Sequence, residues 1–201
     1  MRPPDDAEPP LARVFLACML GRELGARILH PVRESLGAAV GQHLRLYRPD
    51  DLHLTLVFLG PVRRERIDAL ARSVPACLPR VAPLELALGF AGAFPNRREP
   101  RVLWLALEAR RAGALEDLGR VRDAVAELCR GQGFAVDPRP FVPHLTVARL
   151  RGGARPPEAF FEVDADQPWL PRRVALVETV SGAAQSAFRV LGEWPLPGAE
   201  S

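Results

Sequence analysis

Lysine is absent from this chain of 201 residues, so arginine supplies all 27 of the strongly basic side chains. A P-loop nucleotide site needs a lysine, as do Schiff-base and lysyl-adenylate chemistry, and the sequence excludes these classes of enzyme. Arginine is suited to bidentate phosphate binding. The abundance of Ala, Arg, Gly, Pro and Leu indicates a general composition bias as the cause of the missing lysine. The formal net charge of +3 permits an anionic ligand without requiring nucleic acid.

Cysteine is scarce and long apolar runs are missing. The three cysteines, Cys18, Cys77 and Cys129, are odd in number and include no CxxC spacing, which favours a reducing compartment over a disulfide framework. The apolar run 14–20 is too short to span a membrane, and the polar first ten residues do not form a signal peptide. We therefore expect a cytoplasmic protein that does not contact membranes.

Hydrophobic periodicity predicts a single α+β domain over residues 13–196, with a disordered tail at 1–12 and a second tail at 197–201. Predicted helices are residues 22–40, 63–73 and 113–130, with Pro31 either kinking the first helix or starting a second one. Predicted strands are residues 13–18, 44–47, 52–59, 84–90, 102–107, 141–150, 159–163, 173–180 and 188–194.

One tetrapeptide occurs twice, as His53-Leu54-Thr55-Leu56 and His144-Leu145-Thr146-Val147. The copies lie 144 − 53 = 91 residues apart, close to half the chain. The chain has only four histidines and three threonines, so random placement would give about 0.06 His-x-Thr matches. The repeat therefore predicts a shared function for the two segments.

Both His-x-Thr motifs lie in apolar, β-branched surroundings that predict strands. Residues i and i+2 of a strand face the same side, so each motif directs an imidazole and a hydroxyl together. We expect two pseudo-symmetric lobes of antiparallel strands with helices on the outside. Each lobe would give one His-x-Thr strand to a central cleft, where two imidazoles suffice for paired acid–base chemistry.

The motifs and their flanks resemble the two-histidine phosphoesterase superfamily, and within it the LigT-like RNA 2′,3′-cyclic phosphodiesterases, also called 2′-5′ RNA ligases. The resemblance runs from about Arg13 to Leu196. It rests on Arg13-x-Phe15-x-Ala17, on 52–60 around the first motif, on Gly92-x-Phe94-Pro95 and on 140–149 around the second motif. It implies an enzyme that hydrolyses RNA 2′,3′-cyclic phosphate ends to 2′-phosphomonoesters.

Opening a cyclic phosphate requires a base for water and an acid for the departing ribose oxygen, on opposite sides of phosphorus. Imidazole serves both roles near neutral pH. The resemblance implies that His53 is the proton donor and His144 the proton acceptor. Thr55 and Thr146 would bind the non-bridging phosphate oxygens. Neither motif contains a Cys, Asp or Glu, so we predict no metal and no cofactor.

Further substrate contacts are less sharply defined by the sequence. Arg149 falls on the opposite strand face from His144 unless a bulge or the end of the strand redirects it toward the phosphate. Arg97, Arg98 and Arg101 lie in or beside a long loop that could meet the RNA backbone. Phe94 and Phe141 are candidates for base stacking. We assign Phe15 and Phe58 to the hydrophobic core.

The chain departs from the family pattern near its end, where Phe188 stands in place of a tyrosine. The expected partner is an RNA with a 2′,3′-cyclic phosphate end, and we expect a monomer with no obligate protein partner. Two alternatives remain open at this point. The same site could act on small cyclic nucleotides or 2′-5′ linkages, including reverse ligation, or the protein could bind RNA ends without turnover.

Overall fold

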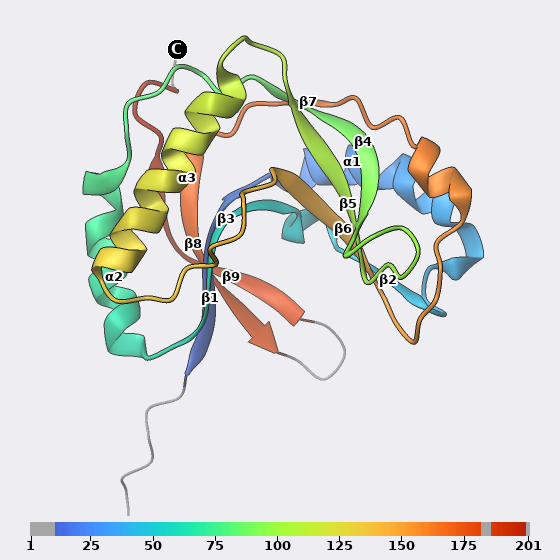
Figure 1. The fold of residues 1–201 in the computed structure, drawn as a ribbon, viewed down its shortest axis with the longest axis horizontal. Helices are drawn as coiled ribbons and strands as arrows, with labels where there is room; N and C mark the ends of the chain where they lie inside the picture. The colour runs from blue at the N-terminus through green and yellow to red at the C-terminus, as the bar shows by residue number, and fades with distance from the viewer. Residues whose placement is uncertain (1–10, 182–185, 200–201) are drawn as a thin grey trace, which may run out of the picture.

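The computed structural model describes residues 11–181 and 186–199, in which nine strands form one antiparallel sheet (Figure 1). The strand order is β7-β4-β5-β6-β3-β1-β8-β9, and β2 also pairs with β6. The strands are β1 (Ala12–Met19), β2 (Leu44–Leu46), β3 (His53–Val62), β4 (Leu86–Phe94), β5 (Val102–Ala109), β6 (His144–Leu150), β7 (Pro168–Trp169), β8 (Arg173–Ser181) and β9 (Ser186–Pro195). The helices are α1 (Arg22–Leu36), α2 (Arg64–Cys77) and α3 (Ala114–Gly131), with 3-10 helices η1 (Gly37–Ala39), η2 (Pro49–Asp51) and η3 (Glu158–Glu162).

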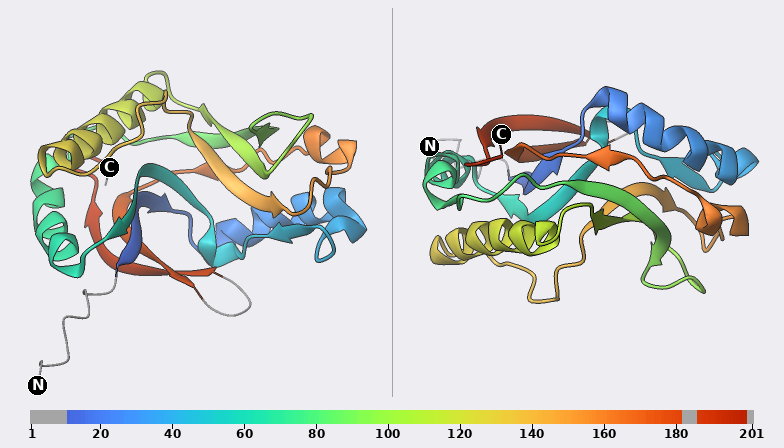
Figure 2. Two further views of the ribbon diagram at one scale, coloured as in Figure 1. Left: turned by 60° about the horizontal axis from the view of Figure 1, so that its bottom comes forward. Right: turned by 90° about the horizontal axis from the view of Figure 1, so that it is seen from above.

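The sheet divides at the β3–β6 junction into two lobes (Figures 1 and 2). We call β1, β3, β8 and β9 with α2 and α3 the β1 lobe, and β2, β4, β5, β6 and β7 with α1 and η3 the β5 lobe. Two helices are exchanged between the lobes. Helix α1 follows β1 in the chain but packs beside η3, whereas α3 follows β5 but packs on α2 and β3. Each lobe is therefore assembled from both halves of the sequence.

One hydrophobic core joins the lobes. Leu16 and Leu54 of the β1 lobe belong to the same buried cluster as Leu105 and Leu145 of the β5 lobe, and all four are inaccessible to solvent. The alternation within each strand sends these leucines to the core and the intervening residues to the opposite face. That opposite face carries both His-x-Thr motifs.

The structure resolves the alternatives at Pro31 and corrects several boundaries. Helix α1 runs through Pro31 without a break and ends at Leu36, and its C-cap residue Gly37 has a φ of 49°, which suits glycine. The strand predicted at 159–163 is wrong, because these residues lie in and beside η3, with Phe160 fully buried. Pro156 and Pro157 precede it and lack the backbone donors that a strand ladder needs.

The chain ends also differ from the predicted tails. Residues 1–10 and 200–201 lie outside the described residues, while Ala12 already belongs to β1. Residues 197–199 pack against the body of the protein instead of forming a tail. The Val81 amide donates a hydrogen bond to the Pro197 carbonyl at 2.9 Å, and Ala199 is fully buried. None of the described helices has the length and apolarity needed to cross a membrane.

Candidate active site

The two motif strands are direct neighbours at the centre of the sheet. Leu54 of β3 is paired with Leu145 of β6 in antiparallel register, and this pair is on the core side. The register therefore places His53 opposite Thr146 and Thr55 opposite His144, all on the other side. His53 and His144 are diagonal neighbours, a relation in which backbone positions are about 7–8 Å apart. The structure thus brings the four motif side chains together.

The two histidines make matching hydrogen bonds. His53 Nδ1 is 2.7 Å from the carbonyl oxygen of Asp51, and His144 Nδ1 is 2.7 Å from the carbonyl oxygen of Val142. A carbonyl can only accept, so each Nδ1 carries the hydrogen and donates it. In each neutral ring, Nε2 then carries no hydrogen, and its lone pair can accept a proton. The pseudo-symmetry of the motifs therefore extends to the tautomer of both imidazoles.

Aromatic side chains surround both imidazoles. The ring of Phe15 lies 4.7 Å from that of His53, and Phe188 meets it edge-on at 4.9 Å. On the other side, Phe94 meets His144 edge-on at 5.0 Å, and Trp104 lies 6.0 Å away. These contacts hold the ring planes and exclude part of the surrounding water, so that both histidines are half-buried.

The removal of water lowers the pKa of both histidines. Burial lowers the pKa of His53 to about 4, and the nearby charges of His144 and Arg149 act in the same direction, while Asp51 opposes them. Burial also lowers the pKa of His144, partly offset by its hydrogen bond to Val142. Both rings are therefore neutral near pH 7 before an anion binds.

A cavity of about 450 Å³ opens beside His53. Thr55, Thr146 and Arg149 line it together with His53, so four of the predicted site residues share one space. His144 does not line this cavity but borders the same strand junction. The arrangement offers two threonine hydroxyls and one guanidinium to a small anion placed next to the His53 imidazole.

A bulge in β6 brings Arg149 into the cavity. Trp104 of β5 pairs with Thr146, but the next residue, Leu103, pairs with Ala148 and leaves Val147 unpaired. The extra residue reverses the alternation, so Arg149 emerges on the same side as Thr146. Its Nε donates a 3.1 Å hydrogen bond to the hydroxyl of Tyr47. The condition that the sequence set for Arg149 is thus met.

Strand β3 has the matching bulge, which corrects the assignment of Phe58 to the core. Ala17 pairs with Thr55 and Leu16 with Val57, leaving Leu56 unpaired at the position equivalent to Val147. Phe58, the counterpart of Arg149, is consequently turned into the cavity with 48% of its surface exposed. Phe15 is buried at 3% exposure, as expected, yet it also lines the cavity.

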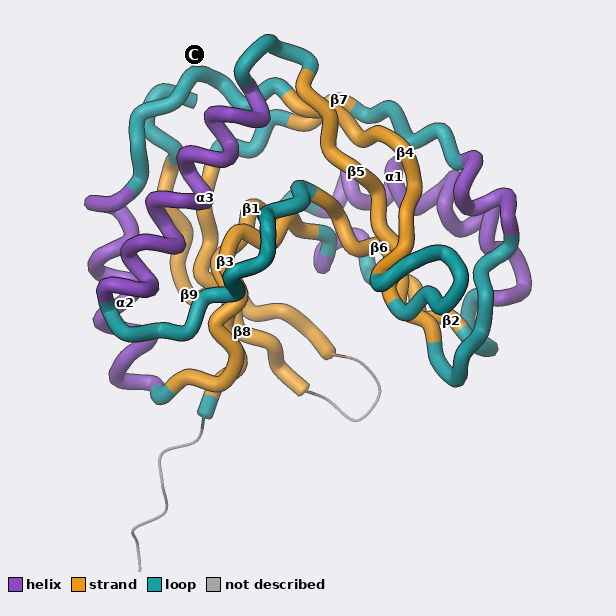
Figure 3. Tube along the Cα trace, in the orientation of Figure 1, coloured by secondary structure: helices purple, strands orange, loops and turns teal. Residues whose placement is uncertain are grey.

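Sequence reasoning did not identify Tyr47 as a site residue, and it treated Phe188 only as a lost hydroxyl. Both line the cavity, and their rings stack with centroids 6.1 Å apart. Tyr47 and Phe188 therefore line the same cavity. Position 188 is the one at which the family pattern has a tyrosine, and here the phenol in the cavity is that of Tyr47. No local signal marks this contact, because Tyr47 follows the short strand β2 and reaches the site only through the β2–β6 pairing (Figure 3).

Three predicted substrate contacts lie away from the cavity. The Arg97 guanidinium stacks on the Phe161 ring at 4.2 Å, and the Arg98 amide bonds to the Asn96 side chain in an exposed turn. The Phe141 ring lies 5.7 Å from the Arg122 guanidinium and packs against the core. Phe94, in contrast, contacts His144.

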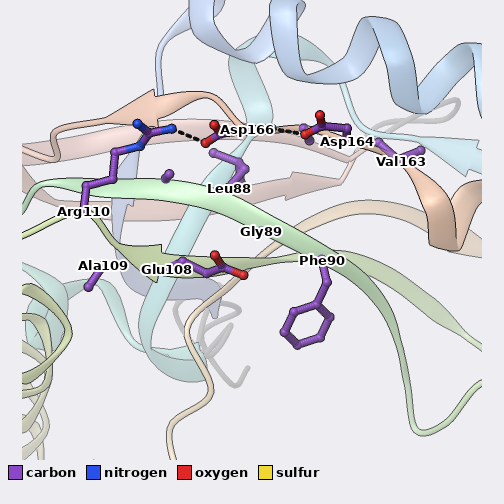
Figure 4. Close-up of a pocket in the computed structure, with 11 residues that line it drawn as sticks. Leu88, Gly89, Phe90, Glu108, Ala109, Arg110, Val163, Asp164 and Asp166 are labelled. Atoms are coloured by element: carbon purple, nitrogen blue, oxygen red, sulfur yellow. Dashed lines mark hydrogen bonds and ion pairs between the residues drawn. The ribbon is translucent and has the colours of Figure 1, made fainter.

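A second hollow, of about 390 Å³, lies on the β4–β5 hairpin (Figure 4). Glu108, Asp164 and Asp166 line it, and Asp166 is ion-paired with Arg110. The Phe90 ring points away from Asp164 and Asp166 (Figure 4), and its centroid lies 5.7 Å from that of Trp104. No residue of either motif reaches this hollow. In the described part of the chain, no group of three or more His, Cys, Asp or Glu side chains is placed to hold a metal ion.

Two neutral imidazoles beside two hydroxyls and an arginine are the kinds of group that acid–base chemistry on a phosphate ester requires. Comparison with known proteins agrees with this class. The sequence pattern of the 2′-5′ RNA ligase superfamily matches residues 24–183, and the chain belongs to this family.

Individual relatives support the same assignment. An RNA 2′,3′-cyclic phosphodiesterase of Methanothermobacter thermautotrophicus is 34% identical over 140 residues, covering 70% of this chain and 72% of the relative. One of Geobacillus stearothermophilus is 37% identical over 118 residues, covering 58% of this chain but only 36% of the relative. The crystal structure of TT0787 of Thermus thermophilus superimposes with a TM-score of 0.73 at 27% identity, covering 94% of this chain and all of that one.

Proposed function

We propose that this protein hydrolyses RNA 2′,3′-cyclic phosphate ends to 2′-phosphomonoesters. The observation that carries the proposal is the convergence of two equivalent imidazoles, each with Nδ1 hydrogen-bonded and Nε2 free, on one strand junction lined by two threonines. Relatives named RNA 2′,3′-cyclic phosphodiesterase that share this chain's family support the choice of substrate.

The proposed reaction is an in-line displacement at phosphorus. Nε2 of His144 takes a proton from water as the water oxygen bonds to phosphorus. The bond from phosphorus to the ribose 3′ oxygen breaks, and protonated His53 gives its Nε2 proton to that oxygen. The net change adds one water and leaves a 2′-phosphomonoester.

The cavity residues supply the remaining groups. Thr55 and Thr146 donate hydrogen bonds to the non-bridging phosphate oxygens, and Arg149 balances the charge that builds on them. The negative charge of the bound phosphate also raises the His53 pKa that burial has lowered, so that the ring takes up a proton from solvent. Substrate binding thus creates the acid that the reaction needs.

The proposal extends to the oligomeric state, cofactors, partners and location of the protein. We infer that it acts as a monomer in the cytoplasm with no cofactor and no obligate protein partner. Three free cysteines among the described residues support a reducing compartment.

A cyclic-phosphate-ended oligonucleotide with chelator present tests the proposal. The wild-type protein should yield a 2′-phosphate end, and His53→Ala and His144→Ala should each lose at least about 10²-fold in rate. Circular dichroism must show that both variants are folded. His30→Ala, an exposed histidine outside the motifs, is the matched control.

Full activity in either motif variant would refute the two-histidine mechanism. Tight binding of the RNA end without turnover would favour the binding-protein alternative. Faster turnover of a cyclic mononucleotide than of the oligonucleotide would favour a small-nucleotide substrate.

A further inference from the structure

Three hollows with shared lining residues lie in a row from the proposed active site along β2, and we call this row the groove. The cavity beside His53 shares Tyr47, Arg149 and Phe188 with a second, narrower hollow of about 50 Å³. That hollow shares Arg45 and Leu46 with a third one of about 280 Å³. The row follows β2, in which Arg45 pairs with Arg149 of β6.

Arginine dominates the walls of this groove. Arg149, Arg48 and Arg45 line the middle hollow, and Arg33 and Arg151 line the outer one with Arg45. Among the described residues that line these two hollows, the one carboxylate is Asp51, which is buried and bonded to Arg48 at 2.9 Å. In the described part of the chain, neither Arg33 nor Arg151 has an acidic partner, and both are exposed. Arg33 and Arg151 therefore present positive charge without an acidic partner at the outer end of the groove.

The reaction geometry gives this line a direction. If His53 protonates the departing 3′ oxygen, an in-line path places the ribose on the His53 side and the water on the His144 side. The preceding nucleotides leave from the ribose, so they start where Tyr47 and Phe188 contact His53, at ring distances of 6.4 and 4.9 Å. That is where the groove begins.

We propose that the groove along β2 binds the RNA backbone 5′ to the cyclic end, with Arg151 and Arg33 contacting phosphates of the upstream nucleotides. This assignment rests on the proposed function for its direction. It makes the protein selective for oligonucleotide ends over mononucleotides, since a mononucleotide fills only the cavity beside His53. Basic grooves that follow the backbone are a general solution for single-stranded nucleic acids.

The double variant Arg33→Gln/Arg151→Gln tests the groove. The readout is the ratio of kcat/KM for a cyclic-ended tetranucleotide to kcat/KM for the cyclic mononucleotide. This ratio should fall about four- to 25-fold, at two- to fivefold for each exposed arginine. The logarithmic salt dependence of tetranucleotide binding should become shallower by about 1.4, because each single-strand phosphate contact contributes about 0.7.

Arg72→Gln/Arg130→Gln is the matched control, since it removes two exposed arginines from α2 and α3 in the β1 lobe. It should leave both the ratio and the salt dependence unchanged. An unchanged ratio in the groove variant, or an equal fall in the control, would overturn the proposal.

Direct binding separates this proposal from the proposed function. Fluorescence anisotropy with a 3′-phosphorylated tetranucleotide measures the groove without any turnover. Salt-dependent binding that weakens in Arg33→Gln/Arg151→Gln supports the groove even if the wild-type protein hydrolyses no cyclic end. Binding that is the same in both proteins refutes it, whatever the activity.

Discussion

At the scale of single residues, the site depends on the environment of His53. Its imidazole is enclosed by Phe15 and Phe188, and its pKa is lowered to about 4 mainly by this burial. The neutral form is favoured in the folded protein, whereas the unfolded chain protonates near 6.5. The free energy of unfolding therefore decreases as pH falls from 6.5 toward 4, and His53 stays neutral at pH 7 until an anion binds.

Replacing Arg149 should raise the pKa of His53. The positive charge of Arg149 is one of the groups that lower this pKa, so Arg149→Gln removes an unfavourable interaction with the imidazolium form. NMR titration of the His53 ring in the free protein measures the change. Arg13→Gln is the control, because Arg13 lines the same cavity but is not among the groups that shift His53. Equal shifts in both variants, or none in Arg149→Gln, would contradict this account.

The sequence was sufficient to find the four motif residues but not their surroundings. A His-x-Thr spacing fixes which side chains share a strand face, so His53, Thr55, His144 and Thr146 follow from local rules. Phe58 and Tyr47 do not. Phe58 faces the cavity because of a bulge at Leu56, and Tyr47 arrives through the pairing of β2 with β6. Neither register is encoded in a short pattern.

At the scale of elements, the paired strands β4 and β5 hold Phe94 and Trp104, the aromatic side chains that contact His144. Trp104 of β5 pairs with Gly92 of β4, and the six-membered ring of its indole lies over that glycine. A Cβ at Gly92 would be 2.3 Å from Trp104 Cζ2. The ring cannot move freely, since it packs against Phe94 at 5.0 Å and is only 8% exposed. Glycine at position 92 therefore leaves the space that the Trp104 ring needs to pack beside His144.

Gly92→Ala should destabilise the protein by about 1–3 kcal/mol, the usual cost of overpacking a core. It should also reduce the turnover of a cyclic-phosphate substrate, because the displaced Trp104 borders His144 at 6.0 Å. Gly119→Ala is the control, as a Cβ there meets nothing within 4 Å. In the middle of α3 it should stabilise by about 0.5–1 kcal/mol. Urea unfolding measures the stability of both variants. A Gly92→Ala variant as stable as wild type would show that Trp104 relocates without cost.

The sequence predicted helices and strands correctly where the hydrophobic periodicity was strong and the element did not depend on pairing with another strand. The stripe of α3 gave a helix at 113–130, and the structure has Ala114–Gly131. The strand prediction for residues 159–163 was wrong because their alternation reflects Phe160 entering the core from a 3-10 helix. Within the described ranges, these residues have no partner strand. The two-residue strand β7 is too short to leave a pattern.

At the scale of the whole molecule, the duplication in sequence is not a division into two independent units. The two motifs predicted two lobes, and the sheet does divide at β3–β6. Periodicity could not show that α1 and α3 are exchanged, because a helix pattern identifies an apolar face and not the sheet that this face covers. The exchange makes each lobe depend on segments from the other half of the chain.

This interleaving predicts a single cooperative unfolding transition. Melting the β5 lobe would release α1, which connects β1 to β2, and melting the β1 lobe would remove α3 from between β5 and β6. Both events expose parts of the one hydrophobic core that joins the lobes. Calorimetric and van't Hoff enthalpies of unfolding should therefore agree.

Tryptophan fluorescence can follow the lobes separately. Trp104 in β5 and Trp194 in β9 report on opposite lobes when the other two tryptophans are replaced by phenylalanine. In each such variant, the fluorescence midpoint in urea should coincide with the midpoint from far-ultraviolet circular dichroism, which reports on the whole chain. Comparison within one variant removes the effect of the substitutions on stability. Separate midpoints would mean that β3 and β6, paired at Leu54 and Leu145, are a boundary between two folding units.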